Sequence, residues 1–340
     1  MSTLSRKYYW IDCSCDEAAG GNFDTYIFEA QHWANRAYER LRSPSDTDFA
    51  RVFNVIFKTP KADTMPCSKP SFWQQVNGIH PENEWKPSAH HVLAALHDFA
   101  HNWSRTPHRE KADVRLYSNR GLARWQPAPN GNIYDPINHI LLTGDWANLT
   151  TGQAFTSYLL PHTAPNPNEN PRRVTIDICP SAWPTTAGSP LSLTHLNPAT
   201  MTTDPNLTIA DLSPTLLPRL LLHEFMHSRA YLLDDHPSDG DTSGWEYCMR
   251  RKKGEAAGCA ESVAMLGLWA GLADLRPAGR SRGGFTMDRG WDSVPGAWDD
   301  EEGFSDDDEE GQVRAGKWDV GVKGNGAVRG EVVFYEDVTR

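Results

Sequence analysis

Apolar positions along the chain recur mostly at helical spacing. They predict amphipathic helices over residues 23–42, 47–58, 88–103 and 215–233, and a last helix over 254–275. The last of these segments is apolar on most sides of the predicted helix. We therefore expect it to be buried.

The helix over 215–233 carries the clearest boundary signals. Thr215 can cap its start, and Pro218 then falls in the first turn, where a missing N–H group costs nothing. His236 and Pro237 follow the helix and predict its end, because the residue before a proline disfavours helical geometry.

Short stretches rich in β-branched residues predict strands. The clearest are "ADVRLYS" (112–118) and "RVTIDICP" (173–180); "NHILLTG" (138–144) is a further candidate within the loop-rich segment 119–172. A last candidate, "GEVVFYEDV" (330–338), lies near the C-terminus. Together with the helices, these strands predict an α+β fold that is rich in helix and has a small mixed sheet.

The character of the chain changes after Leu275. A linker-like stretch, "RPAGRSRGGF", is followed by an acidic run over 299–310 that holds nine acids and no base. We expect one domain over 1–275 and a linker with a disordered acidic tail over 276–340. The acidic run carries most of the formal charge of −11, so the rest is near neutral, without a basic face for nucleic acid.

The apolar runs of the sequence also bear on two classes of protein, those that span a membrane and those that are secreted. None approaches the roughly 18 residues that span a bilayer, so we expect no membrane span. The N-terminal stretch "MSTLSRKYYWIDCSCDE" lacks the apolar segment of a signal peptide. Six cysteines are nevertheless compatible with disulfides, so composition leaves the location of the protein open.

The stretch "LLHEFMH" within the helix over 215–233 carries the chemistry. His223 and His227 are four residues apart and therefore share one helical face, from which both imidazoles can reach one metal ion. Glu224 lies beside them and can take a proton from a water on that ion. Catalytic zinc uses three protein ligands and keeps an open position, so the motif requires a third ligand elsewhere.

The alternative to a metal site is that His223 and His227 are core histidines satisfied by hydrogen bonds. Chance would produce this pattern about 0.03 times in such a chain, and burying these polar groups in an apolar helix without a partner is costly. A second group, His90, His97 and His101, shares a face of the helix over 88–103. We interpret that group as surface histidines, with a second metal site as the alternative.

Several acids downstream of His227 are candidates for the third ligand. Asp234 and Asp235 lie at the end of the same helix and would need a sharp return. Asp239 and Asp241 follow the proline in a stretch of turn composition that can fold back to the ion. Glu261, on the last predicted helix, is the remaining candidate.

Several of these segments resemble the aspzincins, the family of deuterolysins and fungal peptidyl-Lys metalloendopeptidases. The similarity covers roughly residues 170–275 and rests on "VTIDICPSAW", "HEFMH", "DGDTSGW" and "CAESVAML". It implies a zincin-like metallopeptidase domain and an extracellular location. It also implies an aspartate as third zinc ligand, which best matches Asp241 or, one step off register, Asp239.

The chain departs from the family pattern at two places. Ser243 falls near the position of a tyrosine that helps to stabilise the oxyanion, so that role is vacant or passes to Tyr247 or Tyr231. Glu261 matches an acid that the resemblance places in the substrate pocket. The second acid of that pocket is replaced by Ala264, which argues against strict lysine specificity.

The sequence thus predicts a zinc-dependent metalloendopeptidase. His223, His227 and Asp241 (alternatively Asp239) would bind Zn²⁺, Glu224 would act as general base and then acid, and Glu261 would contact the substrate. The expected partner is a peptide or protein substrate, and oligomeric state is not predicted. The alternative is a catalytically weak zincin that acts as a zinc- or protein-binding module.

Overall fold

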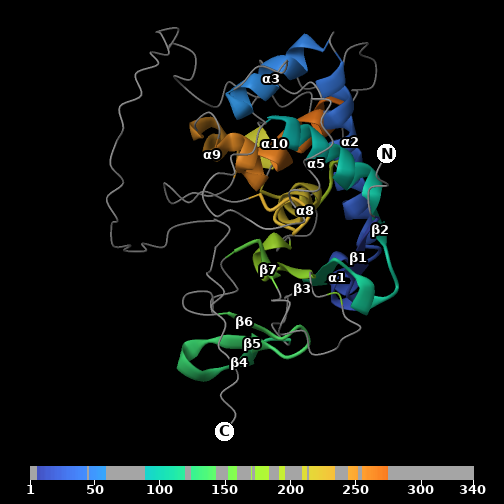
Figure 1. Ribbon diagram of the computed structural model, residues 1–340, viewed down its shortest axis with the longest axis vertical. Coiled ribbons are helices and arrows are strands. Elements are labelled where there is room, and N and C mark those ends of the chain that lie inside the picture. The colour runs from blue at the N-terminus through green and yellow to red at the C-terminus, as the bar shows by residue number, and fades with distance from the viewer. Residues whose placement is uncertain are drawn as a thin grey trace.

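The computed structural model places helices on one side of a mixed sheet (Figure 1). It describes residues 6–43, 46–58, 89–118, 124–142, 152–158, 170, 173–183, 191–195, 209–212, 214–233, 244–251 and 255–274. The acidic run, the tail over 276–340 and the strand expected at 330–338 lie outside these ranges. Among the described residues, no helix has both the length and the apolarity that a bilayer crossing needs.

The helices follow the predicted pattern in most places. The α-helices are α1 (Cys13–Ala19), α2 (Asp24–Arg42), α3 (Thr47–Phe57), α5 (Ala89–Asn102), α7 (Ile209–Leu212), α8 (Leu217–Met226), α9 (Trp245–Arg250) and α10 (Ala260–Asp274). The strands are β1 (Lys7–Ile11), β2 (Trp103–Arg105), β3 (Val114–Ser118), β4 (Gln126–Pro127), β5 (Ile133–Asp135), β6 (Ile140–Leu142), β7 (Ala154–Tyr158) and β8 (Val174–Ile178). The α+β class is therefore confirmed at the level of mixed helix and sheet.

Five of the strands form the main sheet, in the order β2-β1-β3-β8-β7. The first four run parallel to their neighbours, whereas β7 pairs antiparallel with β8 and forms an edge of the sheet. Strands β4, β5 and β6 form a separate antiparallel sheet, which lies at the lower end of Figure 1.

The two faces of the main sheet are buried in different ways. On β8, Val174, Ile176 and Ile178 join the apolar core that the helices share. The alternate position Asp177 forms an ion pair with Arg124, from the segment that leads into the small sheet. One face is therefore covered by apolar helices, whereas the other carries a buried carboxylate that is paired with an arginine.

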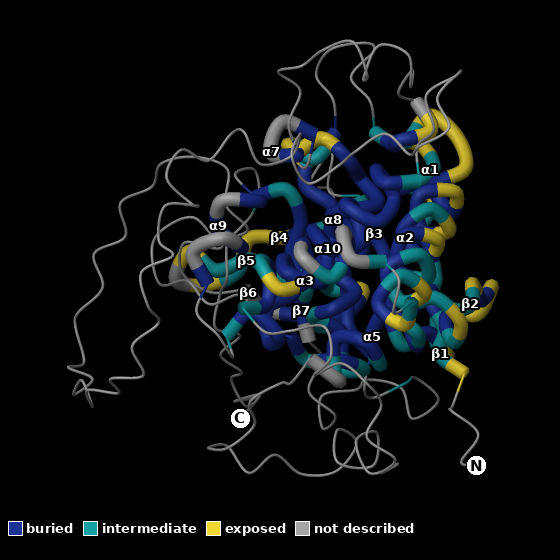
Figure 2. Tube along the Cα trace, turned by 90° about the horizontal axis from the view of Figure 1, so that it is seen from above, coloured by how far each residue is buried: buried dark blue, intermediate teal, exposed yellow. Residues whose placement is uncertain are grey.

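The centre of the fold is the contact between α2, α8 and α10. Residues of α8 and α10 are buried almost throughout, and Figure 2 shows both helices inside a layer of more exposed elements. The helices approach closely where α10 carries glycine. A Cβ atom on Gly267 would lie 2.5 Å from Leu222, and one on Gly271 would lie 2.7 Å from the ring of Trp33.

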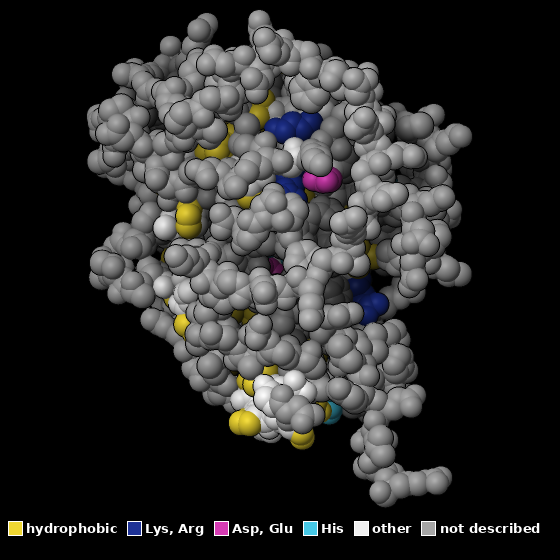
Figure 3. Space-filling model, turned by 90° about the vertical axis from the view of Figure 1, so that its left-hand side faces the viewer, with side chains coloured by type: hydrophobic (Ala, Val, Ile, Leu, Met, Phe, Trp, Pro, Cys, Tyr) yellow, Lys and Arg dark blue, Asp and Glu magenta, His cyan; other side chains and the backbone are white. Residues whose placement is uncertain are grey.

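The surface is visible only in part. On the face shown in Figure 3, described hydrophobic, basic and acidic side chains emerge in separate small areas. Most of that face belongs to residues outside the described ranges. On this face, the described residues therefore form no extended hydrophobic, basic or acidic patch.

Two details of the predicted elements were wrong. The helix predicted over 215–233 ends at Met226, because the chain turns back on itself directly after His227. Thr215 does not cap that helix: Leu216 holds the cap position, while the Thr215 hydroxyl donates to the carbonyl of Leu212. Pro218 does lie in the first turn, as predicted.

The glycine contacts of α10 give a test of packing. We expect Gly271→Ala to lower the free energy of unfolding by about 1–2 kcal/mol, because the added methyl group overlaps a rigid, buried indole ring. Urea denaturation measures this. Gly21→Ala is the matched control, since nothing lies within 4 Å of its Cβ position. Equal losses for the two variants would show that the close approach is not a constraint.

Candidate metal centre

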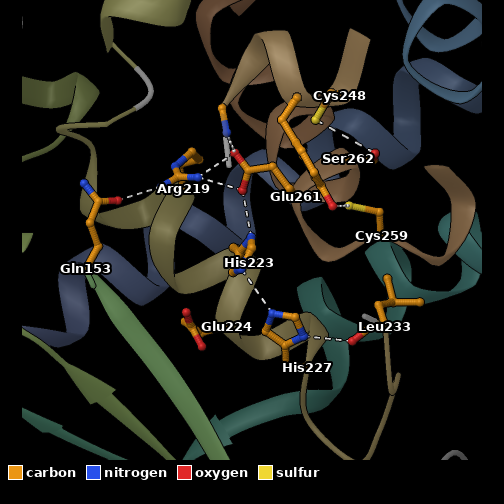
Figure 4. A network of polar contacts seen from close by, with 12 residues as sticks. Gln153, Arg219, His223, Glu224, His227, Leu233, Cys248, Cys259, Glu261 and Ser262 are labelled. Atoms are coloured by element: carbon orange, nitrogen blue, oxygen red, sulfur yellow. Dashed lines mark hydrogen bonds and ion pairs between the residues drawn. The ribbon is translucent and has the colours of Figure 1, made fainter. Parts of the chain in front are cut away.

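The two histidines of the motif meet at the end of α8. His223 lies in the last turns and is 1% exposed, and His227 follows the last helical residue with helical backbone angles. Their ring centroids are 4.8 Å apart. Their Nε2 atoms face each other at 3.1 Å, which brings the two predicted ligands together (Figure 4).

The outer nitrogen of each ring contacts an oxygen atom. Nδ1 of His223 lies 2.7 Å from a carboxylate oxygen of Glu261, and Nδ1 of His227 lies 2.8 Å from the carbonyl oxygen of Leu233. A carbonyl only accepts, so Nδ1 of His227 carries a proton. The same holds for His223, because its partner is an ionised carboxylate.

If both imidazoles are neutral in this tautomer, their Nε2 lone pairs are directed at one point. Two such lone pairs cannot form a hydrogen bond with each other. Zinc–nitrogen bonds of about 2.0–2.1 Å at a tetrahedral angle place two ligand nitrogens about 3.3 Å apart, close to the observed spacing. The donor set and its geometry therefore fit one shared metal ion.

Glu224 lies beside this pair on the side of β7 (Figure 4). Its side chain is 1% exposed, and one carboxylate oxygen accepts a hydrogen bond of 2.7 Å from the hydroxyl of Thr156. Thr156 belongs to β7, the edge strand, and its hydroxyl also lies 3.3 Å from the backbone carbonyl of Glu224. Thr156 was not predicted from the sequence, because β7 is short and lies in a segment expected to be rich in loops.

Glu261 of α10 contacts two side chains of α8 and the backbone at Gly244. Its carboxylate accepts hydrogen bonds from Arg219 at 2.6 and 2.7 Å, from His223, and from the backbone N–H of Gly244 at 2.7 Å. Burial alone would raise the pKa of Glu261. The Arg219 charge, the bond to His223 and the Gly244 N–H outweigh burial and lower that pKa to about 2.

The position of Glu261 bears on its expected role. It touches the outer nitrogen of His223, so it does not occupy the point toward which the two Nε2 atoms are directed. Its side chain is fully buried and engaged by protein groups. The contact of Glu261 with substrate stays a prediction, and this placement does not favour it. In the structure, Glu261 instead contacts and orients His223.

The aspartates predicted as third ligand lie outside the described residues. Asp239 and Asp241 both lie in 234–243, a segment without described residues, as do Asp234 and Asp235. Among the described residues, no group of three or more His, Cys, Asp or Glu side chains is arranged to hold a metal. Of the predicted ligands, the described part of the chain thus contains His223 and His227.

The two tyrosines considered for the oxyanion role are engaged elsewhere. The Tyr231 hydroxyl donates to Asp98 at 2.7 Å and accepts from Trp103 at 2.7 Å. Burial, and then the Asp98 carboxylate, raise the pKa of Tyr231. The Tyr247 hydroxyl lies 3.9 Å from the sulfur of Cys259, and both side chains are buried. Ser243 lies outside the described residues.

The second histidine group lies on α5. The His97 ring packs between Tyr38 and His101, with both pairs of ring centroids 4.7 Å apart, and His101 is exposed. Burial and the neighbouring His101 lower the pKa of His97. The side chain of His90 is outside the described residues, so the surface interpretation of this group stays a prediction.

Comparison with known proteins adds no relative to this geometry: no family model, no curated protein and no solved structure matches the chain. The resemblance to aspzincins therefore rests on the motifs of the sequence alone.

Glu261 gives a test that does not depend on metal. We expect Glu261→Gln to lower the free energy of unfolding of the metal-free protein by roughly 3–5 kcal/mol, because it leaves the buried Arg219 cation without a counter-charge. The loss should be full above about pH 4.5 and vanish as the pH falls toward 2, since the lowered pKa stabilises the fold only while the carboxylate is ionised.

Urea denaturation as a function of pH measures this effect. Glu39→Gln is the matched control, since it removes an acid from an exposed pair with Arg36 and should cost less than about 1 kcal/mol. Similar losses for both variants, or a loss at Glu261 that does not depend on pH, would contradict the buried ion pair.

Proposed function

We propose that the chain is a zinc-dependent metalloendopeptidase of the zincin type. The observation that carries the proposal is the orientation of the histidine pair. Both Nδ1 atoms contact oxygen acceptors, and the two Nε2 atoms face each other at 3.1 Å, a spacing that one ion could bridge. A bound zinc ion would polarise the peptide carbonyl and lower the pKa of a water molecule.

The neighbouring residues suit the remaining steps of peptide hydrolysis. Glu224 is adjacent to the histidine pair, where its carboxylate can take a proton from the attacking water and pass it to the leaving amine. Thr156 holds one oxygen of that carboxylate in place. Strand β7 is the outer strand of the sheet formed by the described residues, and an extended peptide could pair along an edge of this kind.

The third ligand is an aspartate of the segment 234–243 in this proposal. Both ends of the segment are tied to the site, since the carbonyl of Leu233 accepts from His227 and the N–H of Gly244 donates to Glu261. Asp241 precedes Gly244 by three residues, a chain length of about 10 Å at most. This supports Asp241 over Asp239 without excluding the latter.

The first test concerns metal and activity together. Purified protein should carry about one zinc per chain, and Glu224→Gln should keep the zinc while peptide hydrolysis falls roughly 10²- to 10⁴-fold. Metal analysis and a broad peptide library measure the two properties. Glu17→Gln, at an exposed position on α1, should leave both unchanged.

The outcomes separate this proposal from its rival. Zinc binding by a wild-type protein that cleaves no peptide would favour a catalytically weak zincin, acting as a zinc- or protein-binding module. Absence of zinc under non-chelating conditions would contradict both hypotheses.

The second test assigns the third ligand. We expect Asp241→Ala to weaken zinc binding by more than about 100-fold, because it removes a direct ligand, whereas Asp239→Ala should change the affinity little. Competition with a chromophoric chelator measures both dissociation constants. The reverse order of effects would assign the site to Asp239, and two unaffected variants would exclude an aspartate of this turn.

A further inference from the structure

The turn that follows α8 determines the orientation of the second histidine. The chain reverses within residues 228–233, where Leu232 has a left-handed backbone (φ 53°) and the N–H of Leu233 donates to the carbonyl of Met226 at 3.0 Å. This reversal brings the Leu233 carbonyl to Nδ1 of His227. A carbonyl in any other place would not fix that imidazole as the Nδ1-protonated tautomer.

The same turn is attached to the core by Tyr231. Its hydroxyl lies between Trp103 and Asp98, accepting from the indole N–H and donating to the carboxylate, both at 2.7 Å. Tyr231, Trp103 and Asp98 are 2%, 5% and 0% exposed, so water does not compete for these bonds. We call these three residues the Asp98 anchor.

The Asp98 anchor is itself held by two other elements. Asp98 accepts from Lys7 of β1 at 2.9 and 2.8 Å and from Asn102 of α5 at 2.8 Å. Trp103 packs edge-on against Phe225, which lies between the proposed base and the end of α8. The tyrosine therefore joins the turn to a charged group that the sheet and α5 keep fixed.

We propose that the Asp98 anchor positions His227 for the metal. Tyr231 holds the turn, the turn presents the Leu233 carbonyl, and the carbonyl orients the imidazole. The inference rests on the proposed metal site, and it gives Tyr231 a positioning role in place of the oxyanion role considered from the sequence. His223 and His227 thus depend on two different buried carboxylates, Glu261 and Asp98.

The test is the zinc affinity of Tyr231→Phe, which keeps the ring and removes the hydroxyl. We expect the dissociation constant for zinc to rise on the order of 10-fold, as is typical when a group that orients a metal ligand is lost. Competition with a chromophoric chelator measures it, at a temperature at which every variant is folded. Asp98→Asn should raise the dissociation constant in the same direction.

Tyr9→Phe is the matched control. Tyr9 is 1% exposed and its hydroxyl donates to the buried Asp24 at 2.7 Å, but that bond leads away from the turn. A purely structural role of Tyr231 predicts similar losses of thermal stability in both variants and no change of zinc affinity in either. The proposed role predicts that zinc affinity falls for Tyr231→Phe but not for Tyr9→Phe.

A second measurement uses the metal-free protein. Correlation of the imidazole ¹⁵N and ¹H signals should show His227 protonated at Nδ1 in the wild type and in Tyr9→Phe, and a mixture of tautomers in Tyr231→Phe. Unchanged zinc affinity in Tyr231→Phe and Asp98→Asn would overturn the positioning role while leaving the proposed function intact. A wild type without zinc affinity would overturn the proposed function itself, and this inference with it.

Discussion

The structure depends on one buried charge, the carboxylate of Glu261. An ionised side chain without solvent contact is tolerated only when partners surround it, and Arg219, His223 and the N–H of Gly244 fulfil this role. These partners come from α8 and from the start of α9, while Glu261 belongs to α10. The charge therefore fixes where three segments lie relative to one another, and the absence of a side chain at Gly267 allows the helices to come that close.

This constraint also bears on the histidine pair. The two imidazoles are oriented so that their Nε2 atoms face each other at 3.1 Å. The Nδ1 contacts to Glu261 and Leu233 enforce it. In the proposed metal site, both imidazoles would thus be oriented before the ion binds.

The sequence predicted that His223 and His227 share one face of a helix, but not the contacts that orient their rings. The spacing of His223 and His227 follows from the helical repeat, which is local, and so does the burial of the apolar α10. The end of α8 depends on a contact between His227 and Leu233 that forms only after the chain has reversed, so no boundary residue indicates it. The partnership of Glu261 with His223 joins two helices through packing, which residue spacing does not encode.

The edge strand β7 was also not predicted from the sequence, and it bears on the proposed function. Five residues, "AFTSY", are too few for a pattern, yet Thr156 reaches α8 from this strand and donates to Glu224. Side chains alternate along a strand, so Thr156 shares its face with Ala154, while the backbone of the same strand remains the outer edge of the described sheet. A peptide added along that edge would be aligned by the strand that also holds the proposed base. The distance between a bound peptide backbone and Glu224 would then be set by one short element, without a flexible connection between them.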